Sequence, residues 1–189
     1  MSDDAFQKRR QAFEEEFFNK ENQKLKDKLR AELNKQHTRE ELAELTGVED
    51  TLVLDALMAL NVDKGTFAAF ALIPLLEVAW ADGKVDDKER AGIMAAAADQ
   101  GIAPGSVAHT MLQEVLVRPP RADALKAWYA WVGTMSRKLS VSERKQVREA
   151  LVTRARAIAE ASGGFLGLGN KISPKEQRVI DAIEKVFAD

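Results

Sequence analysis

The sequence predicts an all-α protein: a multi-helix bundle of repeated helix-loop-helix units, preceded by one long amphipathic helix. Good helix formers, above all Ala, Leu, Glu, Lys, Arg and Gln, fill most of its 189 residues. No stretch alternates apolar and polar residues with a period of two, as a half-buried strand would. Gly and Pro residues separate segments of helix length, most clearly at 104–105 and 119–120.

The first predicted helix covers about 3–35. Its apolar residues recur at helical spacing and predict one stripe, formed by Phe6, Phe13, Phe17, Leu25, Leu29 and Leu33. Such a helix docks on its own domain, pairs with a second copy of the chain, or lies in a partner's groove, and these outcomes stay open. We assign residues 1–36 to this arm and take Phe6, Phe13 and Phe17 as partner-binding residues.

A short helical pair is predicted over 37–63. Thr38 and Glu41 have the spacing of a capping box, so a helix is expected to begin there and to stop at Gly47. A second helix follows over about 50–60. The pair superficially resembles a helix-turn-helix, but its second helix carries three acidic residues and no Lys or Arg. A helix that reads DNA faces phosphates, so specific nucleic-acid binding is not expected.

The third segment, 64–189, reads as six further helices. Their breaks have physical causes: Gly101 and Pro104-Gly105 end one helix, Ser106 can cap the next, and Pro119-Pro120 forces another break. A Gly-rich loop before the last helix lacks the Gly-Lys-Ser/Thr of a phosphate-binding loop. The predicted helices lie near 66–81, 87–100, 106–117, 122–136, 142–161 and 174–187.

Composition argues against an enzyme. The chain has 28 basic and 30 acidic residues, two His and no Cys, which excludes disulfides, thiolate nucleophiles and Cys-based zinc sites. No catalytic residue is assigned. The start of the chain lacks the features of a signal peptide. The most apolar stretch, 67–81, contains Pro74 and Glu77 and is shorter than the roughly 20 residues of a spanning helix. We therefore expect a cytoplasmic protein with no transmembrane segment.

One short pattern occurs three times, over 82–89, 136–143 and 169–176. Its shared residues are Lys, an aliphatic residue, Asp or Ser, two variable positions and Glu. Each copy predicts a capping box, in which the Asp or Ser and the Glu bind backbone N–H groups at a helix start. The boxes are Asp86 with Glu89, Ser140 with Glu143, and Ser173 with Glu176. The aliphatic residues, expected to staple each loop to the core, are Val85, Leu139 and Ile172.

The first copy is also acidic enough to suggest a cation. It matches the second half of an EF-hand loop, but Val78 and Trp80 stand where the first carboxylates would be, so a self-contained EF-hand is excluded. Asp82, Asp86 and Glu89 would repel each other, and calcium, magnesium or zinc would relieve that repulsion. A solvated, well-capped loop is the alternative. A hydrolase using paired carboxylates lacks a nucleophile–base pair.

Residues 66–189 resemble the TerB-like fold of bacterial tellurite-resistance proteins. The resemblance rests on an apolar helix, then Asp82-Gly83-Lys84-Val85-Asp86-x-x-Glu89, then another apolar helix, with 170–176 fitting the corresponding second half. It implies helices around acidic residues that bind a divalent metal, and a stress-response role in a membrane-associated complex, peripheral to the inner membrane. By motif position it implies Asp82, Asp86, Glu89 and Glu176 as ligands, although Gly169 and Ser173 replace two acidic positions in the late copy.

The arm shows a second, shorter resemblance. Phe6-x-x-Arg9-x-x-Ala12-Phe13-Glu14-x-x-Phe17 is similar to the start of the zeta-type ATPase inhibitor subunit of alphaproteobacteria, over about 30 residues. This resemblance implies a helix that inserts into a partner's groove.

The near-zero net charge conceals two opposed blocks. Residues 47–117 hold 11 acidic and four basic residues, whereas 118–156 hold ten basic and three acidic ones. The basic block contains Arg144 and Arg148, which we take as partner-binding. It could face anionic lipid, RNA or an acidic protein, or meet the acidic half within the fold or in a homodimer.

Two functions follow as expectations. The first is a non-enzymatic TerB-like interaction protein that acts with protein partners and binds a divalent cation. The alternative is an adaptor or inhibitor-like protein that docks its N-terminal helix on an ATPase-like complex.

Overall fold

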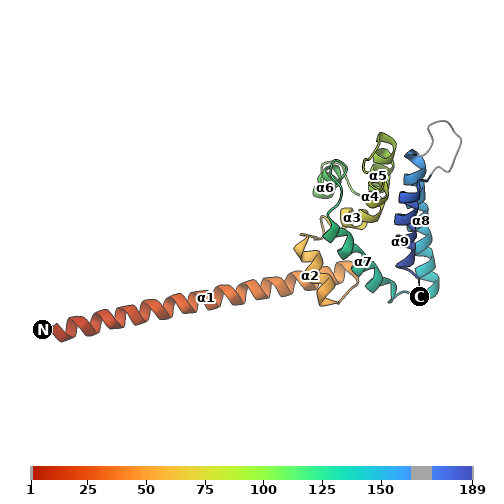
Figure 1. Cartoon of the computed structure of the whole chain (residues 1–189). Helices are drawn as coiled ribbons and strands as arrows, with labels where there is room; N and C mark the ends of the chain where they lie inside the picture. Colours follow the sequence, from red (N-terminus) through yellow and green to blue (C-terminus); the bar gives the residue numbers. More distant parts are fainter. Residues whose placement is uncertain (1, 163–171, 189) are drawn as a thin grey trace. The chain divides into compact units, whose positions relative to one another are not determined.

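The computed structural model describes residues 2–162 and 172–188, and their side chains from Lys20 onward except that of Ser162. These residues form nine α-helices and no strand, which confirms the predicted all-α class (Figure 1). The chain divides into two compact units, residues 1–41 and 42–189.

Unit one is most of helix α1 (Ser2–Thr46), which continues without interruption through residue 38. The predicted helix start at Thr38 is therefore wrong. The Thr38 hydroxyl donates to the Asn34 carbonyl oxygen at 2.9 Å, one turn back in the same helix. No Gly or Pro precedes Thr38 to end the helix, and a cap contributes only about 1 kcal/mol, too little to interrupt a helix by itself.

The described part of the predicted stripe consists of three leucines. Leu25, Leu29 and Leu33 are spaced four residues apart on α1, so they share one face. Their exposed fractions are 57%, 56% and 66%. The side chains of Phe6, Phe13 and Phe17 lie outside the described residues.

Unit two begins with the last turn of α1, which ends at Gly47 as predicted. Gly47 has a φ of +69°, a conformation that favours glycine. Helix α2 (Thr51–Ala59) follows and is capped by Asp50, whose side chain accepts from the backbone N–H groups of Leu52 and Val53. The Trp131 indole N–H donates to the Thr46 carbonyl oxygen at 3.1 Å and ties this corner to α7.

The helix predicted over 66–81 is two helices, α3 (Phe67–Ala71) and α4 (Ile73–Ala79), separated at Leu72. Pro74 supplies the reason. It has no N–H to donate to the Phe70 carbonyl oxygen, and its ring would clash with that carbonyl in a continuous helix. At the start of α4, by contrast, proline is well tolerated.

The remaining helices lie within one or two residues of their predicted bounds. They are α5 (Asp87–Asp99), α6 (Val107–Val115), α7 (Ala122–Ser136), α8 (Val141–Ser162) and α9 (Pro174–Lys185). Helix α4 lies at the centre and contacts α5, α7, α8 and α9 (Figure 1). Six of its seven residues are buried, and Glu77 is the exception. A helix that is apolar on nearly all sides is expected to be enclosed in this way.

Candidate functional site

The first copy of the repeated pattern forms the predicted capping box at the start of α5. Asp86 Oδ1 accepts from the backbone N–H groups of Lys88 and Glu89, at 2.8 and 2.9 Å. The backbone N–H of Asp86 donates to Glu89 Oε2 at 2.8 Å. Glu89 is only 4% exposed, so this carboxylate is part of the interior as well as a cap.

The third copy forms the same box at the start of α9. The backbone N–H of Ser173 donates to Glu176 Oε2 at 2.6 Å, and that of Glu176 donates to the Ser173 hydroxyl at 3.2 Å. Glu176 is 3% exposed. Pro174 occupies the first helical position, where its missing N–H costs nothing.

The fold brings the first and third copies together. The Ser173 hydroxyl donates to Asp82 Oδ1 at 3.2 Å, across 91 residues of sequence. Val85 and Ile172, the aliphatic residues of these two copies, both pack against the core. The acidic loop before α5 therefore lies beside the start of α9.

The second copy has the same local geometry but faces solvent. The backbone N–H of Ser140 donates to Glu143 Oε2 at 2.9 Å, and that of Glu143 donates to the Ser140 hydroxyl at 3.3 Å. Both residues are exposed. The hydrogen bonds from Ser140 hold the pKa of Glu143 below its usual value, because they favour the charged carboxylate.

The predicted metal ligands do not form a recognisable cation site in the described residues. No three His, Asp or Glu side chains there come together in a group that could hold a metal ion. One oxygen of each predicted ligand already accepts a hydrogen bond from the chain itself, as described above for Asp82, Asp86, Glu89 and Glu176. Binding of a divalent cation by these four carboxylates stays a prediction from the sequence.

The two predicted partner-binding arginines lie on α8 and are half-buried. Arg148 Nη1 lies 4.0 Å from Glu184 Oε1 on α9, which places part of the basic block against an acidic residue of the same fold. Arg144 lies one turn before Arg148. Glu184 lies outside the acidic block 47–117, so this ion pair does not join the two charge blocks, and their meeting within the fold stays a prediction.

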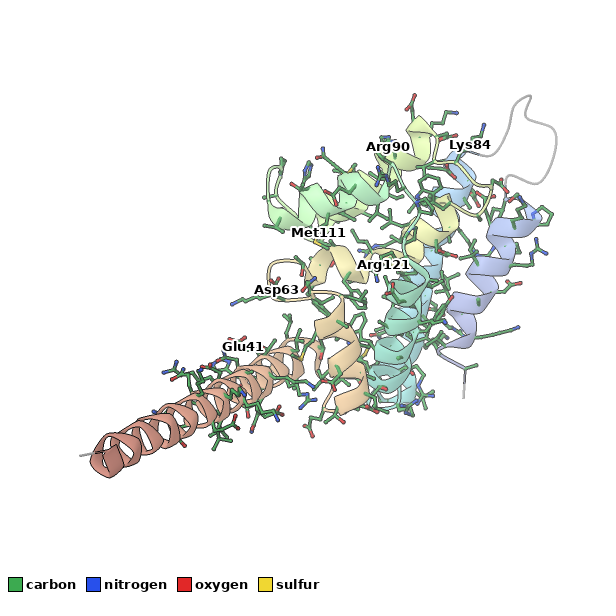
Figure 2. The ribbon with its side chains drawn as sticks, turned by 60° about the vertical axis from the view of Figure 1, so that its left-hand side comes forward. Glu41, Asp63, Lys84, Arg90, Met111 and Arg121 are labelled. Carbon is green, nitrogen blue, oxygen red and sulfur yellow. The ribbon has the colours of Figure 1, made fainter. Side chains whose placement is uncertain are left out.

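One hollow in unit two has a mostly apolar lining and about 900 Å³ of space. We call it the α3–α6 groove. Met111 on α6 and Arg121 at the start of α7 both line it (Figure 2). Its other principal lining residues are Leu60, Val62, Phe70, Ile73, Leu76, Leu112, Val117, Arg118 and Pro119. The sequence does not predict this groove, because its walls come from three separate stretches of the chain, 60–62, 69–76 and 110–124.

A second hollow of about 500 Å³ lies between α4, α7 and α9, and we call it the α4–α9 hollow. It contains Glu77, the carboxylate inside the most apolar stretch. From sequence, Glu77 could reach solvent or join the acidic loop that follows it. In the structure it is half-buried and lines this hollow together with Tyr129, Lys175 and Arg178.

Comparison of the chain with family models, with characterised proteins and with solved structures finds no match. Among the described residues, no helix is long and apolar enough to cross a membrane.

Proposed function

We propose that this chain is a non-enzymatic, TerB-like interaction module that binds an amphipathic helix of a partner protein in the α3–α6 groove. The observation that carries the proposal is the groove itself. A concave, mostly apolar surface of this size is suited to the apolar face of a helix.

The chemistry of the groove specifies the partner helix. Phe70, Ile73 and Leu76 offer rigid apolar contacts, whereas Met111 adapts to the shape of an anchor residue. At the edge, the exposed Arg118 forms no ion pair with another described residue, while Arg121 is paired with Asp123. A partner helix with acidic residues beside its apolar face would complement Arg118.

The TerB-like part of the proposal is supported by the pairing of the two helix starts through Asp82 and Ser173. The TerB-like resemblance implies a role in stress or tellurite responses and in a membrane-associated complex, and we include that role in the proposal. The divalent cation remains a prediction from sequence. Calorimetric titration with calcium, magnesium and zinc tests it: heat that is lost in Asp82→Asn would establish the site, and no heat with any of the three would remove it.

Site-directed crosslinking tests the groove. A photo-crosslinking residue at position 111 should link to a partner, and the linked peptide should be an amphipathic helix with acidic flanks. Met111→Glu should weaken binding of that peptide at least about tenfold, because it places an unpaired charge in an apolar contact. The matched control is Leu52→Glu, which changes an 80% exposed leucine outside the groove. Equal effects of both variants would reject the groove as the binding site.

The second candidate is the adaptor that docks its N-terminal helix on an ATPase-like complex. The exposed face of Leu25, Leu29 and Leu33 favours it. Changing these three leucines to Ala keeps helix propensity and removes the apolar contact area. Loss of partner binding in this triple variant, with Met111→Glu still binding, would select the adaptor over the groove.

A further inference from the structure

The α4–α9 hollow combines both signs of charge with an aromatic wall. Glu77 comes from α4, Tyr129 from α7, and Lys175 and Arg178 from the first two turns of α9. The apolar lining consists of Trp80, Ala81, Leu125, Val179 and Ala182. The lining of this hollow is about equally polar and apolar. Small-molecule sites combine apolar walls with polar groups that set the orientation of the ligand, and this hollow offers both.

Glu77 is a carboxylate without a partner. It forms no hydrogen bond or ion pair within the described part of the chain, although it is half-buried. Burial raises the pKa of Glu77, because desolvation disfavours the charged form. Burial also raises the pKa of Tyr129, and the negative charge of Glu77 adds to that effect. A ligand cation at this position would relieve the cost of the buried charge.

The two cations of the hollow are also available. Lys175 and Arg178 are exposed, and neither forms an ion pair with Glu77 or any other described residue. Opposite charges therefore line one hollow without meeting. A molecule that carries a cation at one end and an anion at the other can bridge them.

We propose that the α4–α9 hollow binds a small zwitterion of the apolar α-amino acid class. The ligand ammonium group binds the Glu77 carboxylate, with the face of Trp80 or Tyr129 beside it. The ligand carboxylate binds Arg178, whose planar guanidinium suits a carboxylate, and Lys175 adds a second positive charge. The apolar side chain of the ligand packs against Leu125 and Val179.

Simple ions fit the hollow less well. A lone anion at Arg178 gains nothing from Glu77, and a lone cation at Glu77 gains nothing from Lys175 and Arg178. The hydrogen bond from Ser173 to Asp82 lies close to this hollow in the chain. It joins the loop after α4 to the start of α9, and so holds the helix that carries both cations against the helix that carries Glu77.

Calorimetry on the full chain tests the ligand class. L-phenylalanine, L-leucine and L-tryptophan are the probes. N-acetyl-L-phenylalanine lacks the ammonium group, and L-phenylalanine amide lacks the carboxylate. We expect at least one free amino acid to bind, and both blocked forms of phenylalanine to bind at least about tenfold more weakly than phenylalanine, since each loses one charge-assisted contact. No binding of any free amino acid in the millimolar range, or equal binding of the blocked forms, would overturn the proposal.

Two variants locate the site. Glu77→Gln and Arg178→Gln should each weaken binding of the free amino acid at least about tenfold. Their matched controls are Glu160→Gln and Arg156→Gln, which change exposed residues of α8 outside the hollow and should bind normally. A thermal melt of each variant establishes that it is folded. Binding that survives both Glu77→Gln and Arg178→Gln would place the ligand elsewhere and reject the assignment.

The α4–α9 hollow and the α3–α6 groove are tested separately. Met111 is not part of the α4–α9 hollow, so Met111→Glu should leave amino acid binding unchanged. Glu77 is not part of the α3–α6 groove, so Glu77→Gln should leave binding of the partner helix unchanged.

Discussion

The C-terminal part of α1 and the start of α9 contain the same local pattern, Ser or Thr followed three residues later by Glu. At Ser173 and Glu176 the two residues cap a helix, with hydrogen bonds in both directions. At Thr38 and Glu41 the pattern lies inside a helix, and the Thr38 hydroxyl bonds back to Asn34. The pattern therefore caps a helix only where the preceding chain is already non-helical.

The three real capping boxes differ in a second respect. Glu89 and Glu176 are buried, whereas Glu143 is exposed, although all three accept a hydrogen bond from their own N-cap residue. Burial changes the energetic consequence of losing the carboxylate. When the carboxylate is removed, an exposed backbone N–H donates to water instead, but a buried N–H is left without an acceptor.

The largest effect is expected at Glu176. Replacing it with Ala should destabilise the fold by about 2–3 kcal/mol, because the Ser173 N–H loses its acceptor and the buried side chain leaves a cavity. Denaturant unfolding measures the difference. The matched control, Glu143→Ala, should cost clearly less, because Glu143 is exposed and water replaces its hydrogen bonds. Equal losses in the two variants would mean that burial of Glu176 contributes nothing beyond the cap.

A smaller effect is expected at the N-cap. Ser173→Ala should cost about 1–2 kcal/mol, because the cap and the hydrogen bond to Asp82 are both lost. Thr38→Ala should be neutral or stabilise α1 by a few tenths of a kcal/mol, since Ala has the higher helix propensity. Circular dichroism and unfolding curves compare them. Loss of stability in Thr38→Ala similar to that in Ser173→Ala would contradict the continuous helix.

Glu77 extends the comparison to a carboxylate that has no partner. Its raised pKa means that the folded state disfavours its charge. Its favourable contribution is therefore complete below the pKa of the unfolded chain and is lost as pH rises through the raised pKa of the folded state. Glu77→Gln should remove this loss, so the variant should be at least as stable as the parent at neutral pH. Melting curves at acidic and neutral pH test this. A variant less stable than the parent at neutral pH would show that Glu77 has a partner.

The smallest effect is expected at Glu143, where the pKa shift has the opposite sign. Hydrogen bonds from Ser140 lower its pKa, so its contribution is present above the pKa of the unfolded chain and is lost as pH falls through the lowered value. An NMR titration should find the pKa of Glu143 returning toward its usual value in Ser140→Ala. An unchanged pKa in that variant would rule out the hydroxyl as the cause.

Much of the helical framework could be predicted because its signals are local. Gly47 and Ser106 act on their immediate neighbours, and each has the predicted role. Two boundaries could not be predicted from the same rules. Whether Thr38 begins a helix depends on whether the residues before it end the preceding one, and they do not. Whether the apolar stretch over 67–81 forms one helix or two depends on whether Pro74 outweighs the continuous apolar run, and it does.

The candidate sites were less accessible to prediction. The capping roles of Asp86, Glu89 and Glu176 were predicted and are confirmed, because capping depends on spacing. The two hollows were not predicted. Glu77 lies about 100 residues from Arg178 in sequence, and no local pattern relates them.

The sequence by itself determined the all-α class, most helix ends and the three capping boxes, since backbone hydrogen bonds and φ preferences act over a few residues. Only the tertiary structure decided which of these boxes is buried, and that Asp82 meets Ser173. It also decided that Glu77 lies in one hollow with Lys175 and Arg178. The physical reason is that burial and long-range pairing depend on which helix faces pack together, and helical periodicity within one segment does not specify its neighbour.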